Sequence, residues 1–276
     1  MDSISSRRTM GDISEYAASG MAKHTGDDDS PAVRYDGVEL SETASALKDK
    51  KICIDPGHGG GDSGAVGPTK FTEKEANLDI ALNLRRYLES KGARVIMTRD
   101  TDTSLTSSVS GVKELGARVK VANESKADVF VSIHNNASDN SATGGTETYY
   151  YAKGSAASKL LARTVFDHQV EKLGLHPRGT FPAKFYVIKY TDMPAVLSES
   201  AFVSNAEEEA KLKDPAFRHT VAEAIGDGIE EYFVKMQGGS IDSSKPNLPD
   251  DGKWDPLPCE KYLTVAQKST SYSSEL

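Results

Sequence analysis

Three side chains of types that bind metals or move protons follow predicted apolar strands. His58 lies a few residues after the apolar run 51–54, His134 directly follows the stretch 129–133, and Glu199 directly follows 195–198. In open sheets of parallel strands, ligands bind at the edge where the carboxyl ends of the strands meet. If these strands are neighbours, two imidazoles and a carboxylate converge in one crevice.

A third protein ligand would complete a zinc site of the two-histidine, one-glutamate type, which keeps one position open for water. Two carboxylates, Glu73 and Glu75, stand at the start of the next predicted helix. Thr72 followed three residues later by Glu75 fits a capping box, in which the glutamate folds back onto its own helix N-terminus. Glu73 is then free to reach the sheet edge. We therefore select Glu73, although spacing alone leaves Glu75 open.

One zinc ion held by His58, Glu73 and His134 predicts hydrolytic chemistry. Zinc lowers the pKa of a bound water to about 7 and polarises a carbonyl group. A carboxylate outside the ligand set must then take the proton and pass it to the leaving amine. Glu199 fits this role as the catalytic base. Taken singly, each residue has an ordinary explanation, such as a favourable acid at a helix N-terminus, so the prediction depends on their joint placement.

Predicted strands and helices alternate between about residues 49 and 236. Such alternation predicts the α/β class, as a single three-layer domain with a largely parallel twisted sheet and helices on both faces. We place this domain at 48–237, between two polar, poorly structured arms at 1–47 and 238–276. The apolar patterns predict strands at 51–54, 94–98, 128–133, 146–151 and 195–198, and helices at 72–91, 115–124 and 155–173, with two more starting at Ser204 and at Asp214.

The glycine-rich stretch 59–64 matches the glycine spacing of a dinucleotide-binding fingerprint. That fingerprint needs a helix to open at once, so that the helix N-terminus meets the pyrophosphate. Here Gly67 and Pro68 intervene, and the predicted helix begins only near Thr72. We therefore reject nucleotide binding and expect these glycines to let the backbone pack tightly around His58.

Composition excludes several other classes of function. The formal net charge of −8 argues against affinity for nucleic acid, which requires a basic surface. No apolar run has the length of a transmembrane segment, and residues 1–29 contain no hydrophobic stretch of signal-peptide type. Two cysteines, Cys53 and Cys259, cannot form a disulfide framework or a thiolate metal site. We expect the chain to be made in the cytoplasm without a Sec-type signal peptide.

Several stretches around these residues resemble a known family, the zinc-dependent N-acetylmuramoyl-L-alanine amidases of cell-wall remodelling and phage lysis. The matching stretches occur in the correct order over about residues 50–236: 54–60 (IDPGHGG), 73–78 (EKEANL), 98–102 (TRDTD), 127–136 (ADVFVSIHNN) and 194–199 (PAVLSE). The resemblance implies zinc on His58, Glu73 and His134, with Glu199 as the catalytic carboxylate. It also implies the bond that is cut, the amide between N-acetylmuramic acid and the L-alanine of the stem peptide. One departure is a longer segment between Asp102 and Arg118, with 107–111 as the extra loop.

The leading hypothesis is a peptidoglycan hydrolase that acts in the cell wall or periplasm after release or delivery. It would be a phage-type lysin, or a cargo of a secretion or contractile injection apparatus that uses the arms 1–47 or 238–276. Two alternatives are a non-catalytic wall-binding protein on an amidase fold and a zinc peptidase that cuts within the stem peptide. The sequence identifies no substrate-binding residues.

Overall fold

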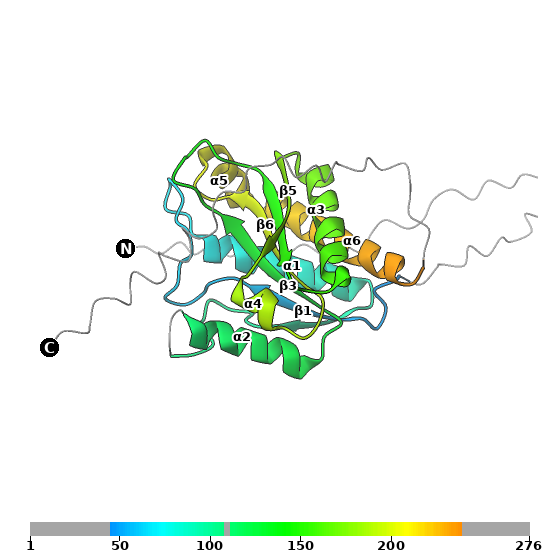
Figure 1. Ribbon diagram of the computed structural model, residues 1–276. Helices are drawn as coiled ribbons and strands as arrows, with labels where there is room; N and C mark the ends of the chain where they lie inside the picture. The colour runs from blue at the N-terminus through cyan, green and yellow to red at the C-terminus, as the bar shows by residue number, and fades with distance from the viewer. Residues whose placement is uncertain (1–44, 108–110, 239–276) are drawn as a thin grey trace, which may run out of the picture. The chain divides into compact units, whose positions relative to one another are not determined.

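A six-stranded sheet forms the centre of the computed structural model, which describes residues 45–107 and 111–238 (Figure 1). Its strand order is β2-β1-β3-β6-β4-β5. Every neighbouring pair is parallel except β4 and β6, which are antiparallel. The predicted largely parallel sheet is therefore confirmed. The strands are β1 (Lys51–Pro56), β2 (Arg94–Met97), β3 (Val129–Asn136), β4 (Thr146–Tyr151), β5 (Pro177–Ala183) and β6 (Ala195–Phe202).

Helices cover both faces of the sheet, which confirms the three-layer α/β architecture. The helices are α1 (Glu73–Ser90), α2 (Val112–Ser125), α3 (Ala156–Leu173), α4 (Tyr186–Tyr190), α5 (Ala206–Lys213) and α6 (Pro215–Met236). α1, α3 and α6 pack on one face, while α2 and α4 pack on the other (Figure 1). Within the described residues, none of these helices is long and apolar enough to cross a bilayer.

Two hydrophobic cores, one on each face, explain why the central strands carry apolar residues on both faces. Ile52 and Ile54 of β1 enter the larger core with α1, α3 and α6, whereas Cys53 between them enters the smaller core with α2 and α4. Successive side chains of a strand point to opposite faces, so a strand covered on both sides needs apolar residues throughout. Cys53 is fully buried, as expected of a core residue.

The helices begin at the predicted caps, except that one cap lies one residue later than predicted. Glu75 accepts hydrogen bonds from the backbone N (3.1 Å) and hydroxyl (2.8 Å) of Thr72, so the capping box that begins α1 is present. The helix expected at Ser204 instead begins one residue later. The Asn205 side chain accepts from the first free backbone amides of α5, while the Ser204 hydroxyl accepts from Ser138 N at 2.9 Å. An asparagine is as good a cap as serine, and its side chain is the one that reaches those amides.

Two elements, β5 and α4, were not predicted from the sequence. β5 contains Pro177, Gly179 and Pro182, which weaken any strand pattern, yet an edge strand tolerates proline because one of its sides needs no hydrogen bonds. Leu47, just before the predicted domain start, is fully buried in the larger core. Residues 1–44 and 239–276 of the predicted arms and residues 108–110 of the predicted extra loop lie outside the described residues.

Candidate active site

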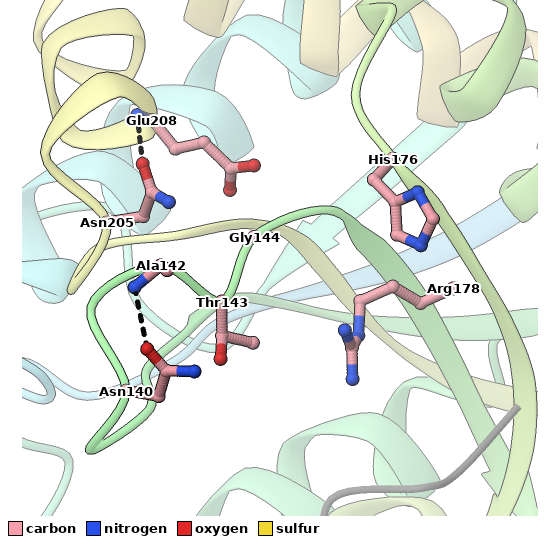
Figure 2. Close-up of a pocket in the computed structure, with 8 residues that line it drawn as sticks. All are labelled: Asn140, Ala142, Thr143, Gly144, His176, Arg178, Asn205 and Glu208. Carbon is pink, nitrogen blue, oxygen red and sulfur yellow. Dashed lines mark hydrogen bonds between the residues drawn. The ribbon is translucent and has the colours of Figure 1, made fainter.

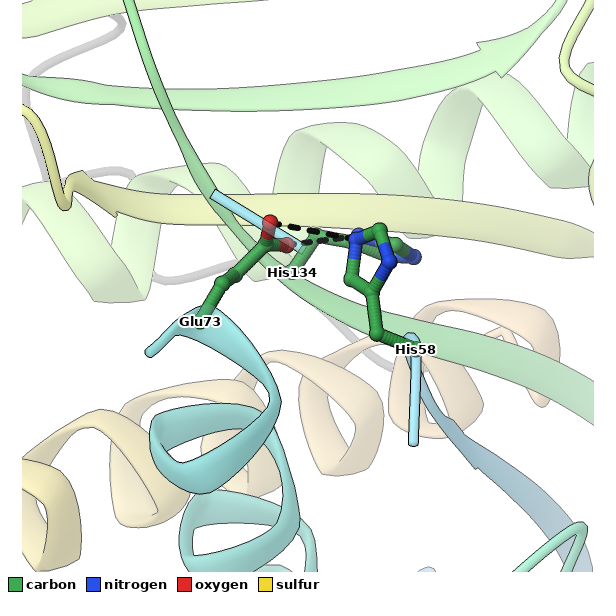
Figure 3. Close-up of side chains that lie close together, drawn as sticks. All are labelled: His58, Glu73 and His134. Carbon is green, nitrogen blue, oxygen red and sulfur yellow. Dashed lines mark hydrogen bonds and ion pairs between the residues drawn. The ribbon is translucent and has the colours of Figure 1, made fainter. Parts of the chain in front are cut away.

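His58, Glu73 and His134 meet at the carboxyl edge of the sheet, and Figure 3 shows the glutamate carboxylate facing both imidazoles. Glu73 Oε2 lies 3.1 Å from His58 Nε2, and Glu73 Oε1 lies 2.9 Å from His134 Nδ1. One potential ligand atom from each residue lies within 4.8 Å of the others. His58 comes from the loop after β1, His134 from β3, and Glu73 from the first turn of α1. The structure thus brings together the three predicted ligands.

Two glycines make room for this cluster. A Cβ atom on Gly57 would lie 2.2–2.7 Å from ring atoms of His134, and one on Gly64 would lie 2.5 Å from Glu73 Oε2. Gly64 also has a φ of 62°, a left-handed conformation that L side chains rarely adopt. The glycine-rich stretch therefore serves close packing around the cluster, as expected from the sequence.

Buried charges hold the turn that carries His58. The Arg118 guanidinium donates to Asp55 Oδ1 (2.9 Å) and to the His58 carbonyl (2.7 Å), and Arg99 donates to the Gly57 carbonyl (2.8 Å). Burial alone would raise the pKa of Asp55, but Arg118 and two hydroxyl donors lower it below its usual value. His58 has a φ of 61°, which is unfavourable for a residue with a Cβ. These hydrogen bonds offset that strain and orient the imidazole.

Two of the predicted ligands, His58 and Glu73, also have a neighbour that orients them. Asp62 lies 2.9 Å from His58 Nδ1, which leaves Nε2 of that ring facing the centre of the cluster. Asn77, one turn after Glu73 in α1, donates to Glu73 Oε1 (3.2 Å) and accepts from Asn135 (2.8 Å). Partners of this kind fix ring tautomers and carboxylate rotamers at metal sites.

Replacing Asn77 by alanine is expected to weaken zinc binding by about 10- to 100-fold, the usual effect of losing a hydrogen-bonding neighbour of a ligand. Asn77 is fully buried, so its loss also costs stability, and the affinity must be measured on the folded fraction. Competition with a chelator of known affinity gives this value. Asn83, a half-buried asparagine on the same helix, is the matched control, because its hydrogen bonds among the described residues stay within that helix. Equal zinc affinity in the two variants would contradict the role of Asn77.

Glu199 on β6 lies directly beside His134, because the two residues are paired in the parallel register of β3 and β6. Its Oε2 is buried and has no hydrogen-bond partner among the described residues. Burial, together with the nearby carboxylates of Glu73 and Glu147, raises the pKa of Glu199 well above its usual value. A carboxyl group of raised proton affinity that keeps a free oxygen is suited to accept and return a proton.

The three carboxylates of this region have different partners, and this difference separates their roles. Glu73 is engaged by both imidazoles, and although burial opposes it, His58 and His134 lower the pKa of Glu73 well below its usual value. Glu147 contacts Arg178, Tyr149 and Asn136. Glu199 alone among the three presents an unpartnered oxygen within the described residues.

The donor set fits a zinc ion. Two imidazole nitrogens and one carboxylate oxygen, drawn from three separate elements, are the ligands of catalytic zinc sites. Burial opposes the charged form of His58, yet Glu73 and Asp62 raise the pKa of this imidazole to about 10. The same carboxylates that hold a proton on His58 would favour a cation in its place, so metal and proton compete for this nitrogen. The unpartnered oxygen of Glu199 would be free to accept a hydrogen bond from a water molecule.

Sequence analysis missed four side chains that surround the site. Arg99 follows β2 and Arg118 lies within α2. Glu147 and Arg178 lie at the starts of β4 and β5. An aspartate near the end of a buried strand, such as Asp55 in β1, predicts a buried cation beside it. The sequence does not indicate which arginine supplies that cation. Of the histidines outside the cluster, His168 lies against Glu231 and His219 lies near Glu223.

Comparison with known proteins agrees with this geometry. A family model described as N-acetylmuramoyl-L-alanine amidase matches residues 52–231. The chain is 42% identical over 198 residues to N-acetylmuramoyl-L-alanine amidase LytC of Bacillus subtilis, covering 70% of this chain but only 38% of LytC. It is 37% identical over 212 residues to the endolysin of Bacillus phage SPP1, covering 74% of each.

A solved structure shares the same fold. The catalytic domain of CwlV, an N-acetylmuramoyl-L-alanine amidase from Bacillus (Paenibacillus) polymyxa var. colistinus, superposes with a TM-score of 0.60 at 46% sequence identity. The match covers 66% of this chain and 97% of the CwlV domain. Residues 52–231, which the family model matches, contain all four predicted site residues and the arginines that hold the His58 turn. The chain therefore belongs to the N-acetylmuramoyl-L-alanine amidase family.

Proposed function

We propose that this chain is a zinc-dependent peptidoglycan hydrolase that cleaves the amide between N-acetylmuramic acid and the L-alanine of the stem peptide. One observation supports the chemistry above all others: a His-Glu-His cluster lies beside a buried, unpartnered glutamate. The identity of the bond comes from the family, since relatives named as muramoyl-alanine amidases match most of the domain.

His58, Glu73 and His134 would hold one zinc ion per catalytic domain. When bound, this ion supplies a Lewis acid that polarises the amide carbonyl and makes a water molecule more acidic. Glu199 then accepts the proton of the attacking water and passes it to the departing nitrogen of L-alanine. Arg99 and Arg118 keep the His58 turn in place during this cycle, because both hold backbone carbonyls of that turn.

Digestion of purified peptidoglycan, with and without a chelator, tests this function. We expect release of new L-alanine amino termini with no new reducing sugar, a loss of that release when the metal is chelated, and recovery on adding zinc. New amino termini other than L-alanine would instead identify a peptidase that cuts within the stem peptide. Binding to the wall without any cleavage would identify a non-catalytic wall protein.

We further propose that the chain acts on the cell wall as a lysin of the phage type, which the similarity to a phage endolysin over 74% of both chains supports. A role in delivery by a secretion or contractile injection apparatus stays a prediction for the arms 1–47 and 238–276. The division of the chain into these two arms and a domain at 48–237 also stays a prediction. Chains that lack either arm, compared for release and for wall lysis, would test it.

A further inference from the structure

A polar pocket of about 390 Å³ opens at the edge of the sheet, between the loop that precedes β4, the start of β5 and the start of α5 (Figure 2). Figure 2 shows the Arg178 guanidinium and the His176 ring on one side of it and Asn140 and Thr143 on the other. Because β4 runs antiparallel to β6, its first residues lie at the carboxyl end of β6, the end that carries Glu199. The pocket therefore opens at the same edge of the sheet as the metal-binding cluster.

A row of paired residues connects this pocket with the catalytic cluster. His134 is in register with Glu199, and Glu199 is in register with Glu147 on β4. Residues in register on neighbouring strands project from the same face of a sheet. Arg178 of β5, which falls at an irregularity in the β4–β5 register, continues the row through its contact with Glu147. A substrate that lies across the strands from the metal would reach Arg178.

Arg178 is held in place before any ligand arrives. Its guanidinium lies 5.3 Å from the centre of the Phe202 ring, and its Nε faces Glu147. A Cβ on Gly145 would lie 2.3 Å from the His176 carbonyl and 3.0 Å from Arg178 Cγ, so the bare backbone of this glycine lets β5 pack closely. With Nε engaged, the terminal nitrogens of Arg178 turn toward the pocket (Figure 2).

The pocket is built to receive an anion rather than a cation. Its one carboxylate is Glu208, whose two oxygens already accept hydrogen bonds from Gly145 N (2.7 Å) and Phe202 N (2.6 Å). Burial raises the pKa of Glu208, against the lowering effect of these two backbone donors. The guanidinium of Arg178 presents a planar pair of N–H groups, a geometry that matches a carboxylate.

The chemistry of the substrate indicates which of its carboxylates would bind Arg178. This step depends on the proposed function. On the glycan side the lactyl carboxyl is consumed in the scissile amide, so ionised carboxylates occur only along the stem peptide. Three strand spacings separate β3 from β5, roughly 14 Å, and the Arg178 side chain reaches back over one of them. An extended peptide advances about 3.4 Å per residue. The distance that remains after the reach of the Arg178 side chain therefore corresponds to two or three residues. We propose that Arg178 binds a carboxylate on the second or third residue of the stem peptide and so makes the enzyme prefer peptides that are not amidated there.

Synthetic muramoyl tripeptides with either a free carboxylate or a carboxamide at the second or the third residue test this proposal on the zinc-loaded full chain. We expect kcat/KM to fall by about 10-fold or more when one of these carboxylates is amidated, as for the loss of a charged hydrogen bond. In Arg178→Gln the ratio of kcat/KM between the free-acid and amidated substrates should fall to about one. Arg178→Lys should retain part of this preference.

The ratio between substrates separates recognition from indirect effects. Removing Arg178 leaves Glu147 without its cation beside Glu199, which changes turnover of both substrates by the same factor. The double variant Arg178→Gln/Glu147→Gln removes that charge and should still show no preference. Equal cleavage of all substrates by the unaltered chain, or a preference that survives in Arg178→Gln, would overturn the proposal and leave the amidase function standing. No cleavage of any of them would overturn the proposed function, and this inference with it.

Discussion

Glu199→Gln is expected to lower kcat/KM for cleavage of the muramoyl–alanine amide by about 10²- to 10⁴-fold, the usual contribution of a positioned general base. Glutamine keeps the shape of the side chain but cannot take up the proton of the attacking water. Zinc content should stay at one ion per chain, since the three proposed ligands are untouched. Amide cleavage with purified muropeptides, together with metal analysis of the same sample, measures both quantities.

Stability provides the control for this variant. Burial and, after it, two neighbouring carboxylates raise the pKa of Glu199, so a neutral amide at this position removes both the cost of burying a charge and the like-charge repulsion. The temperature of thermal unfolding should therefore not fall, and lost activity cannot be attributed to unfolding. Loss of zinc from Glu199→Gln would instead make Glu199 a ligand and contradict its assignment as the base.

Glu73→Gln is expected to weaken zinc binding by more than the roughly 10- to 100-fold found for the loss of a ligand's neighbour. Glu73 supplies the only carboxylate of the cluster and faces both imidazoles, and it is 5% exposed. Without its negative charge, the two histidines alone must hold the ion. Zinc affinity by chelator competition and amide cleavage at a fixed zinc concentration should fall together.

Glu75→Gln is the matched control, because it makes the same chemical change two residues away on the same helix. Glutamine can replace glutamate in a capping box, so the start of α1 is preserved. We expect zinc affinity and activity close to those of the unaltered chain. If Glu75→Gln lost zinc and Glu73→Gln kept it, the choice of ligand would be wrong, and the capping box would not separate the two residues.

The amino-acid pattern alone predicted the α/β class and placed His58, His134 and Glu199 together. Both results depend on local rules: an apolar run predicts a buried strand, and residues that follow parallel strands meet at one edge. The ranking of Glu73 over Glu75 was also local, since a capping box involves residues only three apart. The structure shows Glu75 on the cap and Glu73 between the histidines.

The surroundings of these four residues depend on the tertiary structure. Asp55 required a buried cation, but Arg118 lies 63 positions away and could be identified only once α2 was packed on the sheet. Glu147 reaches Glu199 because β4 pairs antiparallel with β6, and the strand pattern of 146–151 is the same for either direction. Arg178 lies on the edge strand β5, whose prolines and glycine weaken the sequence pattern of a strand. Strand order and direction depend on contacts between distant segments, and these determine which charged groups meet at the site.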